Sequence, residues 1–244
     1  MSEDQLILQR KFPITSRHAD FKSELRISSL INDYIQIAWQ HAEELGLGYL
    51  HLKEQGLGWV LSRFTLNLDY LPKWPGEIEI KTWPKGMNRL FYLRDAEIFN
   101  EGKKFASITS AWLIFDINSK RPKVLYQDRP YLHSLADKHA IDEITPSLKT
   151  EGIPVESMEH EIRYNDIDVN LHLTTVRYLD FLLDSYDIEF IRKNPPKKLR
   201  VNFLKEVAFG DKTVLQRLEN EKIHSFELST PGKNAINFRA EITY

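Results

Sequence analysis

The sequence contains no cysteine among its 244 residues. This absence excludes structural disulfides, thiolate metal sites and a cysteine nucleophile. The N-terminal stretch MSEDQLILQRKF lacks the charged-then-apolar pattern of a signal peptide. No later stretch approaches the roughly 18–20 consecutive apolar residues that a membrane-spanning helix needs. A reducing compartment is the simplest setting for such a chain, so we expect a cytoplasmic protein.

The sequence also lacks a strong charge of either sign. Lys and Arg total 33 against 35 Asp and Glu, which gives a formal net charge of −2. The chain therefore has no overall positive electrostatic field that would attract nucleic acid or an anionic membrane. An acidic partner would have to bind at a local basic patch. Glycine-rich phosphate loops, paired metal-binding histidines and carboxylate clusters are missing too, so the sequence predicts neither a cofactor nor a metal.

The sequence does contain the same order of predicted elements in each half, a helix followed by a run of strands. Residues 28–46 have helical spacing of apolar residues, and residues 58–124 alternate and turn as four antiparallel strands. The C-terminal half repeats this order, with a helix over 174–186 followed by a run of strands. The apolar stripe of the first helix consists of Leu30, Ile31, Tyr34, Ile35, Ala38, Trp39 and Ala42. We therefore predict an α+β fold of two units, each a long helix against an antiparallel sheet, with the sheets joined edge to edge.

The segment 118–153 is polar, punctuated by proline and without a sustained period, which is typical of a connection between domains. We expect an N-terminal domain over 1–133, a linker over 134–154 and a C-terminal domain over 155–244. All five tryptophans lie before the C-terminal domain, so the halves differ in role. Core and turn packing is the simplest interpretation of the tryptophans, and an apolar ligand tunnel lined by one or two of them is the alternative.

Polar side chains gather immediately before the second predicted helix, in RYNDIDVNLHLTT. Asp168, Asn170 and His172 are spaced by two, so in an extended segment all three point to one face, and Val169 and Leu171 face the core. A polar loop that merely caps the helix is the favoured interpretation for any single residue here. It is not favoured for the set.

Thr174 and Thr175 mark the start of the second helix, where backbone N–H groups can polarise a carbonyl or hold an oxyanion. Asp166 lies further from the helix and fits a capping or supporting role. The remaining histidines have no comparable acid and amide nearby, and we expect them on the surface or hydrogen-bonded in the core: His18, His41, His51, His133, His139, His160 and His224.

The motif Asp168-Val-Asn170-Leu-His172 resembles the D-x-N-x-H motif of the acyl-ACP thioesterases of plants and bacteria, where it precedes the helix of the C-terminal hotdog domain. That family also carries a glutamate followed by a cysteine, and the matching residues here are Glu206 and Val207. The N-terminal segments GLGWVLSRFTLNLDYLPKWPGEIEIKTWP, LFYLRDAEIF and SAWLIFDINSKRP resemble the first hotdog domain in order and spacing. The resemblance covers nearly the whole chain.

The resemblance implies two tandem hotdog domains that hydrolyse fatty acyl-ACP to free fatty acid and holo-ACP, which ends chain elongation. Asp168 is then the nucleophile or the carboxylate that activates water, and Glu206 is the second carboxylate. Asn170 binds the substrate or the oxyanion, and His172 is their hydrogen-bonding partner. Which carboxylate reacts stays open, with Asp168 preferred. Substrate contacts are expected from Thr174 and Thr175, and from Ala38 and Trp39 in an acyl pocket of the N-terminal domain.

The partner implied is an acyl carrier protein, which is acidic. The densest basic run, Arg192–Arg200, is either a solvated segment after the helix or the carrier-docking surface. The rival functions are an acyl-CoA thioesterase, a hotdog dehydratase or hydratase, and a non-catalytic acyl-binding module. The sequence around His172 lacks the glycine and proline of the dehydratase pattern, and the retained acids argue against a non-catalytic module. The oligomeric state is open, with a homodimer as one alternative.

Overall fold

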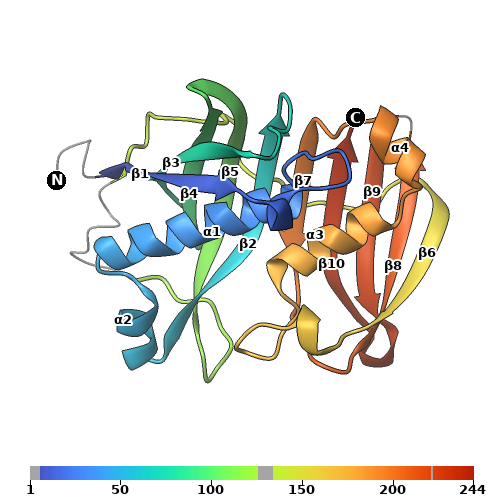
Figure 1. Cartoon of the computed structure of the whole chain (residues 1–244). Helices are drawn as coiled ribbons and strands as arrows, with labels where there is room; N and C mark the ends of the chain where they lie inside the picture. The colour runs from blue at the N-terminus through green and yellow to red at the C-terminus, as the bar shows by residue number, and fades with distance from the viewer. Residues whose placement is uncertain (1–5, 126–133, 221) are drawn as a thin grey trace. The chain divides into compact units, whose positions relative to one another are not determined.

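The computed structural model describes residues 6–125, 134–220 and 222–244. Two compact units form, one from Met1–Leu25 and Asp33–Thr145, the other from Arg26–Asn32 and Pro146–Tyr244. In each unit a helix lies across one face of an antiparallel sheet (Figure 1). The predicted α+β fold, a helix against an antiparallel sheet in each unit, is confirmed.

The sheet of the first unit has the strand order β1-β3-β4-β5-β2. Its strands are β1 (Leu8–Ile14), β2 (Leu57–Leu68), β3 (Gly76–Asn88), β4 (Phe91–Asn100) and β5 (Lys103–Asp116). β2 to β5 are the four predicted strands, whereas β1 was not expected from the sequence. The helices of the unit are α1 (Ile27–Glu44), which belongs to it from Asp33 onward, and the short α2 (Tyr49–Glu54). A 3-10 turn, η2 (Ser16–His18), precedes α1.

The buried stripe of α1 is displaced from the predicted one. Leu30, Ile31, Tyr34, Ile35, Ala38 and Ala42 are buried as expected, and Ile37 and His41 are buried with them. Trp39 is 51% exposed, so its predicted place in the core is wrong. Successive residues of a helix are rotated by 100°, and on this basis the buried face of α1 is centred between Ile31 and Tyr34. Trp39 lies at the edge of that face, next to the exposed side.

The sheet of the second unit has the order β7-β10-β9-β8-β6. Its strands are β6 (Ile153–Glu161), β7 (Lys198–Phe203), β8 (Lys212–Asn220), β9 (Ile223–Thr230) and β10 (Ala235–Thr243). The helices are α3 (Thr175–Asp184) and α4 (Ile188–Lys193), and the 3-10 turns are η4 (Tyr164–Asp166) and η5 (Pro231–Lys233). α3 buries Tyr178, Leu179, Phe181 and Leu182 against this sheet.

The segment that follows Ser134 is held to each sheet by hydrogen bonds. In the first unit, the indole N–H of Trp83 donates to Lys138 O (3.0 Å), and Lys85 Nζ donates to Ile141 O (2.5 Å). In the second unit, Leu148 N donates to Asn202 Oδ1 (2.8 Å). Residues 134–150, predicted to be part of a polar connection, are thus built into the two units.

Candidate active site

The loop before α3 is a tight turn that Asp168 organises. Asp168 Oδ1 accepts hydrogen bonds from the backbone N–H groups of Asn170 (2.8 Å) and His172 (3.2 Å). Asp168 N donates to His172 O (2.8 Å), and Leu171 N donates to Asp168 O (3.0 Å). Such an aspartate, bonded to its own backbone two residues on, is typical of a turn.

The turn corrects the extended geometry predicted for this segment. Leu171 has a φ of +63°, a left-handed conformation that reverses the chain and breaks the alternation of faces. Val169 and Leu171 were expected in the core, but they are 90% and 61% exposed. Asp168, Asn170 and His172 still belong to one surface because one compact turn carries all three.

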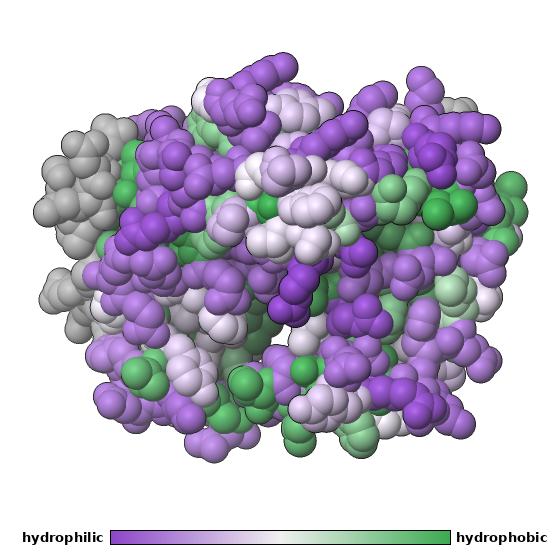
Figure 2. Space-filling model, viewed as in Figure 1, coloured by the Kyte–Doolittle hydropathy of each residue, from purple (hydrophilic) through white to green (hydrophobic). Residues whose placement is uncertain are grey.

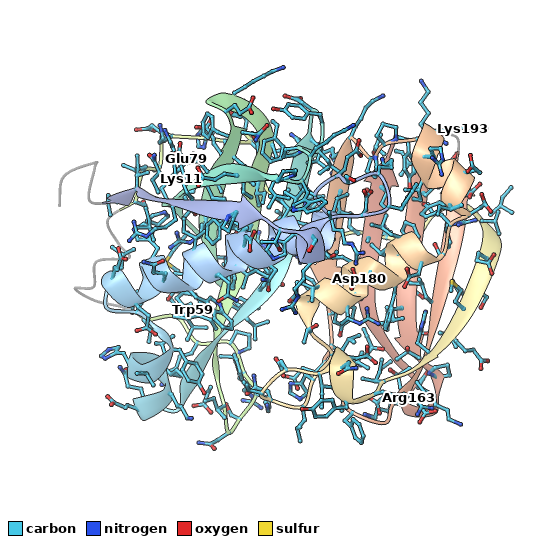
Figure 3. All side chains as sticks on the ribbon, viewed as in Figure 1. Lys11, Trp59, Glu79, Arg163, Asp180 and Lys193 are labelled. Atoms are coloured by element: carbon cyan, nitrogen blue, oxygen red, sulfur yellow. The ribbon has the colours of Figure 1, made fainter. Side chains whose placement is uncertain are left out.

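Asp166 fixes the chain just ahead of this turn. Its carboxylate accepts from Arg163 N (2.9 Å) and from Arg177 Nε (2.8 Å), and it is buried. Arg177 also donates to Asp180 on the next turn of α3 (3.0 Å), a residue marked in Figure 3. The supporting role expected of Asp166 agrees with these contacts. Its arginine partner was missed, although Arg177 lies only three residues after the predicted start of the helix.

A second loop, residues 204–211, joins the turn through the backbone. Leu173 N donates to Val207 O (2.8 Å), and Phe209 N donates to Leu171 O (3.1 Å). Between these bonds, His172 pairs with Ala208. β7 ends at Phe203, so Glu206 lies in this loop and not on the strand.

The joined loops bring the predicted acid and imidazole together. His172 Nε2 lies 3.4 Å from Glu206 Oε2, and 30% and 51% of the two side chains are exposed. Asn170 is exposed on the same turn. This pair can exchange a proton and hold water at the surface of the second unit.

Two further groups lie close to the pair. Burial raises the pKa of Tyr178, whose hydroxyl has a hydrogen bond with the backbone of Val207. Sequence patterns gave no sign of Tyr178, because a tyrosine on the buried stripe of a helix is ordinary. Thr174 is the N-cap of α3 and Thr175 its first residue, as predicted, so the N-terminal N–H groups of the helix lie next to the turn.

Other predicted substrate contacts lie on α1. Ala38 is 4% exposed, and Trp39 projects from the same helix. Three of the remaining histidines have ordinary structural roles: His41 contacts the buried Arg94 at 3.0 Å, His160 stacks on Phe181, and His224 contacts Tyr186. Burial lowers the pKa values of His160 and His224. His133 lies outside the described residues.

Among the described residues, no group of three or more His, Cys, Asp or Glu residues is placed to hold a metal ion. None of the helices in that part of the chain is long and apolar enough to cross a membrane. The space-filling view shows mostly hydrophilic residues with hydrophobic ones between them (Figure 2).

The fold and the site together define the class as a protein of two hotdog domains with an acid–imidazole site. A helix on an antiparallel sheet occurs twice, as in two hotdog domains, and the second copy carries an acid–imidazole pair beside the start of its helix. The crystal structure of an acyl-ACP thioesterase from Bacteroides thetaiotaomicron aligns over 100% of this chain and 99% of its own, with a TM-score of 0.91 and 26% identity. The 12:0-ACP thioesterase of Umbellularia californica aligns with a TM-score of 0.77 over 98% of this chain and 96% of its own. Its identity is 15%, so that likeness concerns the fold.

Sequence comparison gives the family. Residues 5–129 match the acyl-ACP thioesterase N-terminal domain, and residues 154–244 match the acyl-ACP thioesterase C-terminal domain. The chain belongs to the acyl-ACP thioesterase family. Over 83% of this chain, the sequence is 25% identical to the chloroplastic acyl-[acyl-carrier-protein] hydrolase FATB1 of Cuphea viscosissima. Over 88% of this chain, it is 23% identical to the chloroplastic palmitoyl-acyl carrier protein thioesterase of Arabidopsis thaliana. The matched regions span 52% and 55% of these two plant enzymes.

Proposed function

We propose that this protein hydrolyses fatty acyl-ACP thioesters to free fatty acid and holo-ACP. The observation that supports this most strongly is the contact between His172 and Glu206 on two loops joined beside the start of α3. An acyl thioester needs a placed base, a donor for the developing oxyanion and a slot for the chain. The C-terminal unit supplies the first two.

In the proposed reaction a water molecule attacks the thioester carbonyl while its proton passes to the His172–Glu206 pair. A C–O bond forms, and the carbonyl oxygen becomes an oxyanion that Asn170 and the N–H groups at the start of α3 stabilise. The C–S bond then breaks, and the proton returns to the leaving thiolate. Thr174 and Thr175 are proposed to contact the carbonyl end of the substrate through this helix start.

The acyl chain is proposed to lie in the N-terminal unit, with Ala38 and Trp39 of α1 as lining residues. This unit carries the larger share of aromatic residues, including all five tryptophans. Ala38 lies within the buried stripe of the helix, and its small side chain leaves space that the acyl chain is proposed to fill.

The setting proposed for this reaction is the cytoplasm, with an acyl carrier protein as partner and a homodimer as a candidate assembly. The absence of cysteine is compatible with a reducing compartment. Sedimentation of the purified chain over a range of concentrations tests the dimer.

A panel of acyl-ACP and acyl-CoA thioesters of increasing chain length tests the function. The proposal expects equal amounts of free thiol and free acid, with acyl-ACP preferred. A dehydratase or hydratase would change the acyl chain and leave the thioester intact. A binding module would release neither product, so each rival gives a different outcome.

A further inference from the structure

The first unit contains a copy of the turn that carries the candidate site. Asp20 Oδ1 accepts hydrogen bonds from the backbone N–H groups of Lys22 (2.8 Å) and Glu24 (2.9 Å). Asp20 N donates to Glu24 O (2.8 Å), Ser23 N donates to Asp20 O (3.0 Å), and Ser23 has a φ of +60°. Each of these features has a counterpart around Asp168, with Leu171 at +63° in the place of Ser23.

The copy extends to the second loop. Leu25 N donates to Pro72 O (2.8 Å), as Leu173 N does to Val207 O. Trp74 N donates to Ser23 O (2.8 Å), as Phe209 N does to Leu171 O. A 3-10 turn precedes both copies, and a long helix follows both.

The copy in the first unit has the aspartate but not the reacting groups. Glu24 stands in the place of His172 and forms an ion pair with Lys22, Nζ to Oε2, of 2.7 Å. Leu71 stands in the place of Glu206, one residue before Pro72. Asp20 therefore makes the two hydrogen bonds of Asp168 in a loop that has neither the imidazole nor the second acid.

We propose that Asp168 is a positioning residue, which builds the turn that presents Asn170 and His172, and that Glu206 is the carboxylate that, with His172, takes the proton of the attacking water. This inference rests on the proposed thioesterase function. One oxygen of Asp168 is directed at two N–H groups of its own loop, and the other lies 3.5 Å from the amide nitrogen of Asn170. Glu206 is the carboxylate in contact with the imidazole.

Asparagine at position 168 separates the two roles. Its side-chain oxygen can accept both backbone hydrogen bonds, but an amide is neither a nucleophile nor a base. Neutral hydrogen bonds are about half as strong as charge-assisted ones, so we expect Asp168→Asn to keep kcat within about tenfold of the wild type. Asp168→Ala removes the acceptor, and Glu206→Gln removes the reacting group, so each lowers kcat by roughly 10²–10⁴-fold. KM should change little in all three variants.

The matched controls are Asp20→Asn and Asp20→Ala in the first unit. Asp20→Ala breaks the equivalent hydrogen bonds and should lower the melting temperature about as much as Asp168→Ala, yet retain the wild-type kcat. This difference separates positioning of the site from a contribution to stability alone.

The experiment measures kcat, KM and the melting temperature of the full chain with one acyl-ACP substrate. Recovery by Asp168→Asn of at least ten times the kcat of Asp168→Ala supports the inference. A folded Asp168→Asn variant as inactive as Asp168→Ala overturns it, and so does an Asp168→Ala variant with the wild-type kcat. A wild-type chain that releases no thiol contradicts the proposed function itself, which is a separate result.

Discussion

Asp33 is an acid on α1 that is only 8% exposed. Burial raises its pKa to about 6, and the neighbouring charge of His18 opposes that change. The folded state therefore favours the protonated acid, whereas the unfolded chain ionises near the usual value of about 3.9. The stability that Asp33 contributes is full below the unfolded pKa and is lost as the pH rises through 6.

Asp33→Asn should therefore stabilise the protein at neutral pH and lose that advantage in acid. We expect the variant to raise the free energy of unfolding by about 1–3 kcal/mol at pH 7, with the gain shrinking between pH 6 and pH 4. Urea denaturation at several pH values measures it. Asp184→Asn, the same change at an exposed position on α3, is the control. A gain at Asp33 that is independent of pH would show that the buried charge is not its cause.

The sequence predicted which residues would form the candidate site, but not how the chain holds them. The spacing by two residues predicted that Asp168, Asn170 and His172 share one face, and the resemblance to the family added Glu206 to the candidate site. The orientation of Val169 and Leu171 could not be predicted, because a non-glycine residue with positive φ leaves no mark in a pattern of apolar residues. The contacts of Asp166 with Arg177 depend on η4, an element too short to show a period.

At the scale of elements, β3 and β4 share a buried ion pair. Lys85 Nζ lies 3.1 Å from Asp95 Oδ2, with 6% and 0% of the side chains exposed. The same two groups bind the segment after Ser134, through Lys85 to Ile141 O and through Asp95 from Ala140 N (2.7 Å). Removing one partner leaves a buried charge without its counter-ion.

Lys85→Met should therefore lower the free energy of unfolding by about 3–5 kcal/mol. Lys11→Met, which breaks an exposed pair with Glu77, is the matched control and should change the free energy of unfolding far less, because solvent screens that pair. Lys11 is marked on β1 in Figure 3. Equal costs for the two variants, measured by urea denaturation, would mean that the buried pair does not hold these elements together.

The elements that the sequence missed are those with little periodic burial. β1 buries only its two end residues, and none of the residues of β6 is buried. Both are edge strands of their sheets, where alternation is weak. α2 and α4 have six residues each, fewer than two full turns, so no apolar stripe could reveal them.

The acyl pocket proposed for the first unit is tested on α1. Ala38→Leu should shift the preference toward shorter acyl chains, because the added side chain takes space that the substrate would fill. Ala240→Leu, at a buried position on β10 of the second unit, controls for the 1–3 kcal/mol or so that overpacking a core costs. Relative rates over a series of chain lengths measure the shift. An unchanged profile for Ala38→Leu, or the same shift in both variants, would place the pocket elsewhere.

At the scale of the whole molecule, the distribution of charge indicates where the proposed acyl carrier protein would dock. The basic run Arg192–Arg200 covers the end of α4 and the start of β7, whereas Glu206 follows the far end of that strand. The five residue steps from Lys198 to Phe203 span about 17 Å, so the lysines of the run lie far from Glu206. Figure 3 shows Lys193 and Arg163 at opposite ends of the second unit. Arg163, and Lys212 opposite Glu161, lie at the end that carries the site.

We therefore expect Arg163→Glu with Lys212→Glu to raise KM for acyl-ACP several-fold, and KM for acyl-CoA by less. Lys197→Glu with Lys198→Glu is the matched control, with the same change in charge far from the site. Because the effect is electrostatic, it should weaken at high salt. A larger effect from the control pair would make the basic run the docking surface, and equal effects on both substrates would remove the carrier protein from the explanation.

The most direct measurement follows the free thiol released from one acyl-ACP by the purified chain. The protein has no cysteine, so a thiol reagent reports no thiol of the enzyme. We predict that the wild type releases one fatty acid per thiol, that Glu206→Gln lowers the rate by roughly 10²–10⁴-fold, and that the exposed Glu159→Gln leaves it unchanged. No thiol release by the wild type, or a wild-type rate in Glu206→Gln, would contradict a thioesterase that works through the His172–Glu206 pair.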